Sequence, residues 1–343
     1  MANIFDKGAS ITHDGSVADD FMQAVAGSYP EIDNIFEVYQ GIKSQMKLIE
    51  FLNGGTALKV GDGCVPIDPT TTSTFEQKLL IVKNALFEGA QCAQELEGTL
   101  YEDELKSGAL KNDIVGSRFM NEFAIPKLLA LVNKEFMEVT SFGDTASPDS
   151  VLQIADGFWK RLQAATTVAE EDGALVGVGS LIVDLDQTVG TRAIDYLEIL
   201  YTGSESANAT PTPLVLKNLR PKDKIFLVTG SIFDNYRKTL QDAGLANGII
   251  QNTTDGIEKL SYNGVEVLPI RGWDSVIASK LSDVDPHRII YTSRKNLVLN
   301  LDSKSDLENL EAQYVFKDDM TYVRGRLKVG TAYKWGALTQ ISY

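Results

Sequence analysis

Two segments at the N-terminal end of the chain cannot build a hydrophobic core of their own. Residues 1–40 contain seven acidic residues and one basic residue, with little continuous apolar pattern. Residues 47–87 carry short apolar runs separated by Gly-rich turns at 53–55 and 61–63 and by a Thr-rich stretch at 69–74. This pattern predicts strands joined in one long hairpin. Because a two-stranded ribbon is only marginally stable alone in water, both segments must lie on the rest of the chain or on a neighbouring copy.

The charge balance disfavours two classes of partner. Across 343 residues, 32 Lys and Arg stand against 47 Asp and Glu, which gives a formal net charge of −15. Cationic side chains hold polyanions and anionic membrane surfaces, so we expect tight binding of neither. No apolar window approaches the roughly 18 residues that span a bilayer, and the first residues lack a secretory signal. We therefore expect no membrane span and synthesis in the cytoplasm.

Cysteine and histidine are scarce: the chain has Cys64 and Cys92, and His13 and His287. These are too few for a disulfide framework or a multi-ligand zinc site. We expect free thiols, with one disulfide as the alternative. Neither histidine lies in a nucleophile motif, so each is expected to be a surface or hydrogen-bonded residue without a catalytic role.

The strongest helical segment covers residues 118–139, where apolar residues recur at helical spacing. Pro126 lacks an amide donor, so it either kinks one long helix or lies in the first turn of a shorter one. A further helical patch is expected within 88–112. Beyond a loop, Ser147 as N-cap and Pro148 at the first helical position predict another helix.

The second half of the chain mixes strands with helices and then becomes β-rich. Strands are expected at 181–185 and 225–229, and a helix runs from a cap at Ser231 to a stop at Gly244, which together predict a mixed α/β domain. Asn263-Gly264 predicts a tight hairpin turn, because both positions tolerate positive φ. Near the end, apolar residues alternate with Tyr322, Arg324, Arg326 and Lys328, which predicts a strand with one apolar and one basic face.

One short motif suggests chemistry. In SLIVDLDQTVG, an apolar strand runs into Asp184 and Asp186. This resembles the first motif of the haloacid-dehalogenase-like phosphatases. There the first Asp attacks a phosphoryl group, the second acts as acid and base, and both help to hold magnesium. The resemblance would add Thr229 at the end of a second strand, with Lys280 as the family's lysine.

Further metal ligands in that interpretation would be Asp318 and Asp319, but an alternating strand follows them where the family has a helix. The simpler interpretation leaves Asp184 and Asp186 on the solvated side of a strand or loop. A magnesium-dependent phosphatase with Asp184 as nucleophile is therefore the alternative function. A binding or scaffold protein built on the same α/β domain is a third class.

The order of the segments resembles the major capsid proteins of tailed bacteriophages, which have the Hong Kong 97-type shell fold. The segments that carry the resemblance are KIFLVTGSIFDNYRKTLQDAG, NGVEVLPI, RIIYTSRKNLVLNLDSKSD and YVRGRLKVGTAYKWGALTQISY. The resemblance implies an α+β fold. Its parts would be an N-terminal arm (1–46), an extended hairpin loop or E-loop (47–87), a peripheral domain with a spine helix (88–149), an axial domain (150–285) and a β-rich return to the peripheral domain (286–343).

By this resemblance the protein is structural, with no enzymatic activity, cofactor, metal or catalytic residue. Many copies would form the hexamers and pentamers of an icosahedral head in the virion, assembled in the cytoplasm of a host bacterium. The shell would enclose double-stranded DNA without binding it tightly. Further partners would be portal, scaffold or decoration proteins, with no membrane involved.

Some members of that family strengthen the shell with a crosslink between a lysine and an asparagine. Lys59 on the hairpin is the candidate here, with a plain surface lysine as the alternative. The sequence begins with the acidic arm and not with a long charged helical region. A separate scaffold, or earlier processing, is therefore expected.

Overall fold

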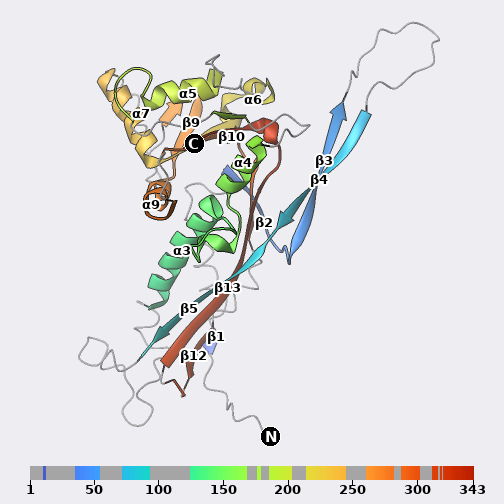
Figure 1. Cartoon of the computed structure of the whole chain (residues 1–343), viewed down its shortest axis with the longest axis vertical. Coiled ribbons are helices and arrows are strands. Elements are labelled where there is room, and N and C mark those ends of the chain that lie inside the picture. Colours follow the sequence, from blue (N-terminus) through green and yellow to red (C-terminus); the bar gives the residue numbers. More distant parts are fainter. Residues whose placement is uncertain are drawn as a thin grey trace, which may run out of the picture.

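The computed structural model describes residues 11–12, 35–54, 72–92, 124–167, 176–178, 185–202, 214–244, 260–281, 287–301, 311–315, 317–318 and 320–343. These residues form two six-stranded sheets, a two-stranded ribbon, and helices that pack on the sheets (Figure 1). The protein therefore has an α+β fold, as the sequence predicted.

The first sheet, which we call the peripheral sheet, is built around one long strand, β13 (Met320–Tyr333). It comprises β1 (Ile11–Thr12), β12 (Glu311–Val315), β13, β11 (Leu297–Leu301) and β2 (Phe36–Tyr39) in that order, with β5 (Lys83–Gln91) also paired to β13. Val323 and Val329 of β13 are buried, whereas Arg324 and Arg326 between them are exposed. The predicted alternation of an apolar and a basic face is confirmed.

The helix α3 (Ile125–Phe142) packs against the peripheral sheet (Figure 1). Pro126 lies in its first turn, where its missing amide donor leaves no helical hydrogen bond unmade, while residues 118–123 of the predicted helical segment lie outside the described residues. The helix continues past the predicted end at 139 and is followed by Gly143. A Cβ at Gly143 would lie 2.0 Å from the carbonyl oxygen of Ala155, so this turn accepts only glycine.

The helix predicted to begin at Pro148 is interrupted. A short 3-10 turn, η4 (Leu152–Ile154), is followed by extended backbone and then by a separate helix, α4 (Phe158–Thr167). The cause is a close approach to the end of α3, because Gly157 N–H donates to the carbonyl of Gly143 at 2.7 Å. Tertiary packing therefore overrides the local helical signal.

The second sheet, which we call the axial sheet, has the order β6–β14–β10–β7–β9–β8. Its strands are β6 (Val176–Val178), β14 (Thr339–Ser342), β10 (Ile289–Ser293), β7 (Lys224–Val228), β9 (Val265–Pro269) and β8 (Leu260–Tyr262). The accompanying helices and turns are α5 (Ala193–Thr202), α6 (Leu214–Asn218), η5 (Pro221–Asp223), α7 (Gly230–Asp242), α9 (Gly272–Val276), the π-helical η6 (Ile277–Leu281) and η7 (Gly336–Leu338). Asn263 and Gly264, between β8 and β9, have φ of 48° and 77°, which confirms the predicted turn.

The start of α7 differs from the sequence prediction. The helix begins at Gly230, before the predicted cap Ser231, and a residue distant in sequence supplies the cap. Asp274 of α9 accepts the N–H groups of Gly230 at 2.6 Å and of Ser231 at 3.2 Å. A carboxylate at this position satisfies free donors and the positive end of the helix dipole. The predicted stop is confirmed, since Gly244 has a φ of 74°.

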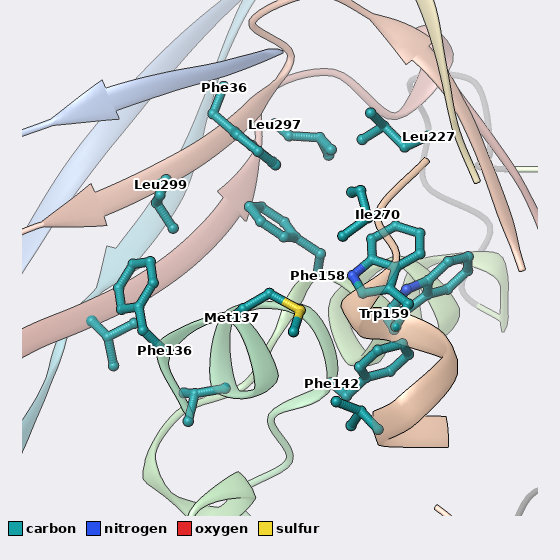
Figure 2. Packing of buried hydrophobic residues seen from close by; sticks show 14 of the residues in the cluster. Phe36, Phe136, Met137, Phe142, Phe158, Trp159, Leu227, Ile270, Leu297 and Leu299 are labelled. Atoms are coloured by element: carbon teal, nitrogen blue, oxygen red, sulfur yellow. The ribbon is translucent and has the colours of Figure 1, made fainter. Parts of the chain in front are cut away.

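One hydrophobic core joins the two sheets. Leu297 comes from the peripheral sheet and Leu227 from the axial sheet, while the helices supply large aromatic side chains (Figure 2). Phe142 of α3, Trp159 of α4 and Trp273 of α9 have ring centroids 5.5 to 6.4 Å apart. Burial of each such side chain contributes roughly 2 kcal/mol, so this cluster ties the two halves of the molecule together.

The hairpin is shorter than the sequence suggested. Its strands are β3 (Gln45–Gly54) and β4 (Thr72–Ile81), paired antiparallel along their whole length. Residues 83–87, which the sequence placed in the hairpin, begin β5 and pair with β13. Residues 88–91, the first of the segment in which a helical patch was expected, continue the same strand, and residues 93–112 of that segment lie outside the described residues. The apolar run is continuous through this region, so only pairing shows where the hairpin ends.

Candidate assembly surfaces

The β3–β4 hairpin projects from the rest of the molecule (Figure 1). Among the described strands, β3 and β4 pair only with each other, so each has an unpaired edge. At the base, Val82 N–H donates to the carbonyl of Ser44 at 3.1 Å, and Leu80 is fully buried against Val298 and Ala332. The hairpin is thus anchored at one end and presents strand edges that another chain can contact.

A groove of about 40 Å³ lies between α3 and the peripheral sheet, where apolar side chains of α3, β5 and β13 meet. Leu86 lines it and remains 45% exposed, and Leu131 of α3 is 50% exposed. Glu135 also lines the groove, and burial, together with the charge of Glu138, raises the pKa of its carboxyl. Leu86 gives the groove an exposed apolar edge, and Leu131 is a second exposed apolar side chain, on α3; exposed apolar side chains of this kind suit contact with protein.

A buried ion cluster joins the second half of α3 to η6. Lys280 Nζ lies 2.7 Å from Glu138 Oε2 and 3.3 Å from Asp149 Oδ1. The Glu138 side chain is 4% exposed and that of Lys280 is 20% exposed. Burial opposes the charged form of Lys280, but the two carboxylates outweigh it and raise its pKa. Lys280, the lysine of the phosphatase alternative, is therefore held in a structural contact.

The other described residues of the phosphatase alternative lie in different parts of the fold. Asp186 is in a turn, where its carboxylate accepts the N–H of Thr188 at 3.1 Å. Thr229 is buried after β7, and its hydroxyl accepts a hydrogen bond from Ser231 at 3.2 Å. Asp318 is in the exposed turn between β12 and β13, far from α5 and α7 (Figure 1). These residues do not form one site.

Several predicted residues lie outside the described part of the chain: Asp184, Asp319, Lys59, Cys64 and His13. The predicted strand 181–185 also falls there, except for Leu185, which is in a loop.

Cys92 and His287 are the cysteine and the histidine that lie within the described residues. Cys92 is a free, half-buried thiol at the end of β5, as expected. His287 is buried, and its Nδ1 lies 2.8 Å from Ser231 Oγ. Of the two expected environments, a surface position or a hydrogen-bonded one, His287 therefore has the second.

The basic face of β13 lies beside acidic neighbours. In the strand register Arg324 stands opposite Glu88 on one side and Glu311 on the other. Opposite charges at paired positions stabilise a sheet. This fits the interpretation in which the basic residues meet acids of the same chain.

Within the described residues, no three His, Cys, Asp or Glu side chains gather in a way that could hold a metal ion. Among the described helices, none combines the length and apolar composition needed to cross a membrane.

Several solved structures match this fold over most of its length. The capsid of an empty GTA particle matches 91% of this chain and 88% of its own, with a TM-score of 0.54 and 11% identity. The procapsid of satellite phage P4, which includes the size determination protein, matches 97% and 92%, with a TM-score of 0.53 and 12% identity. The chain has the fold of a phage capsid subunit. The capsid of the myovirus XM1 matches 99% of this chain and 94% of its own, with a TM-score of 0.50 and 13% identity.

The predicted resemblance to phage capsid proteins is therefore confirmed for the fold. No protein-family model and no curated protein sequence matches the chain. At 11–13% identity these structures show a similar fold with few identical residues.

Sequence reasoning missed two features of these surfaces. The ion cluster of Glu138, Asp149 and Lys280 joins residues from three separate segments, so no local pattern reveals it. Trp335, which is 41% exposed, follows β13, and no local pattern distinguishes it from the buried residues around it.

Proposed function

We propose that this chain is the major capsid protein of a tailed bacteriophage and adopts the Hong Kong 97-type shell fold. Copies would form the hexamers and pentamers of an icosahedral head that encloses double-stranded DNA. The observation that carries the proposal is a fold match extending over 91–99% of the chain to three capsid structures. A structural role without catalysis accounts for the dispersal of the described phosphatase residues.

The parts of the fold take proposed roles in that shell. We assign residues 1–44 to an N-terminal arm, 45–81 to the E-loop, 82–149 to a peripheral domain with α3 as its spine helix and 150–285 to an axial domain. Residues 286–343 supply return strands to both sheets, because β11, β12 and β13 lie in the peripheral sheet whereas β10 and β14 lie in the axial sheet. The projecting hairpin supports this assignment, because its unpaired edges and small interior favour contact with a neighbouring subunit.

Charge supports the proposed relation to DNA. A net charge of −15 makes the chain repel a polyanion, so a wall built from it would enclose a genome without holding it. We further propose a location in the virion, assembly in the host cytoplasm, and portal, scaffold or decoration proteins as partners. Lys59 stays a proposal for a crosslinking residue.

Electron microscopy of the expressed chain tests the function. Particles hundreds of ångströms across are expected from the chain alone or with a scaffold, and strictly monomeric protein under both conditions would refute the proposal. Replacement of residues 48–78 by a short linker should abolish assembly but leave the subunit folded, because both large sheets are formed without the hairpin and the buried Leu80 is kept. Asp186→Asn is the matched control, and it should assemble normally.

A further inference from the structure

Trp335 is the exposed member of the three tryptophans in the chain. Trp159 and Trp273 are each 1% exposed within the core, whereas Trp335 is 41% exposed. Tryptophan is a large apolar side chain that proteins bury or place in contact surfaces.

The main chain at Trp335 is held rigidly by Asn296, which is 2% exposed. Asn296 Oδ1 accepts the Trp335 N–H at 3.0 Å, and Asn296 Nδ2 donates to the Trp335 carbonyl at 3.0 Å. The Asn296 carbonyl also accepts the N–H of Lys334 at 2.9 Å. The turn between β13 and η7 is thus fixed before any partner arrives, so little conformational entropy remains to be lost on binding.

Charged and polar groups lie beside this turn. Lys334 Nζ pairs with the carboxylate of Glu37, and the Tyr39 hydroxyl donates to the same carboxylate at 2.6 Å. Lys295 is exposed and lies near enough to Glu37 to help stabilise its negative charge. We call Trp335, Lys334, Lys295, Glu37 and Tyr39 the tryptophan patch. It carries two cations and one anion beside the turn that holds Trp335.

We propose that the tryptophan patch is a contact surface for a neighbouring copy of this chain. An exposed aromatic residue on a rigid turn, with polar groups beside the turn, is an arrangement found where a few residues dominate binding. The choice of partner follows from charge, because a copy with a net charge of −15 presents an acidic surface to a patch that is net positive. The inference rests on the proposed shell function, since it names one surface through which subunits of that shell meet.

Tryptophan fluorescence tests this inference without a mutation in the assembling protein. Because Trp159 and Trp273 are buried, quenching by the neutral molecule acrylamide reports mainly on Trp335. Quenching is measured on purified particles and on folded subunits dissociated from them. We expect the quenchable fraction to fall and the emission to shift to shorter wavelength in particles. The Trp335→Phe variant, which removes the signal, confirms its assignment.

Each outcome bears on a different claim. If no particles form, the proposed function fails and the patch fails with it. If particles form while Trp335 stays as accessible to acrylamide as in subunits, the inference is overturned and the shell function stands. Trp335→Ala should weaken the contact between subunits by on the order of 50-fold, whereas Trp335→Phe should weaken it much less. The unfolding midpoint of the isolated subunit should change little in either variant, which separates a lost contact from a lost fold.

Discussion

Replacement of Lys280 by methionine should destabilise the subunit by roughly 3 kcal/mol, because it leaves a buried carboxylate without its nearest cation. Glu138 is 4% exposed on its side chain, and Lys280 Nζ lies 2.7 Å from it. Lys134, the other cation near Glu138, is 3.8 Å away and 62% exposed, so it compensates weakly. Asp149 is 33% exposed and can be rehydrated, so most of the cost comes from Glu138.

Urea unfolding of the unassembled subunit measures this effect, since assembly would add a stabilisation that depends on concentration. At typical entropies of unfolding for a chain of this length, about 3 kcal/mol lowers the thermal midpoint by roughly 4 °C. Lys160→Met is the matched control. Its ion pair with Asp144 is 3.0 Å long, but the side chains are 47% and 31% exposed, so its loss should cost below about 1 kcal/mol.

A double variant tests the reasoning about the buried charge. The double variant Glu138→Leu with Lys280→Met removes both ions. Its loss of unfolding free energy should be smaller than the sum of the losses in the two single variants by roughly 2 kcal/mol. Additive effects, or a Lys280→Met variant no less stable than Lys160→Met, would refute the claim that burial makes this contact different.

Two further predictions concern a glycine and a tyrosine. Gly143→Ala should destabilise the subunit by about 2 kcal/mol in urea unfolding, because its Cβ would meet a main-chain oxygen at 2.0 Å. Gly89→Ala, whose nearest contact would be 3.8 Å away, should have little effect, and equal losses in both variants would contradict the packing argument. The hydrogen bond to Glu37 and burial raise the pKa of Tyr39 to about 12, so its stabilising contribution is present below the ordinary tyrosine pKa and is lost as pH rises through about 12. In Glu37→Gln, ultraviolet titration should show Tyr39 ionising at lower pH, and an unchanged titration would exclude Glu37 as the cause.

Features encoded within a few residues were predictable from the sequence. Pro126 marks the first turn of α3, and the alternation around Arg324 and Arg326 gives the two faces of β13. Asn263-Gly264 gives the turn between β8 and β9. In each case local sterics or periodicity settles the conformation, so no distant residue is needed.

Features that depend on residues distant in the sequence were not predictable. The helix expected from Pro148 is broken where the backbone at Gly157 meets the end of α3. The cap of α7 comes from Asp274, 43 residues beyond Ser231. The hairpin ends at Ile81 because β5 pairs with β13, more than two hundred residues further along the chain.

The sequence by itself determined that the N-terminal segments lack an independent core, that strands and helices mix in the second half, and that their order resembles a phage capsid subunit. These properties follow from composition and periodicity, which act along the chain. Only the tertiary structure decided which charges are buried, where Lys280 finds its partners, and that Trp335 is presented on a fixed turn. Such properties depend on the removal of water and on contacts between distant segments, and neither exists until the chain has folded.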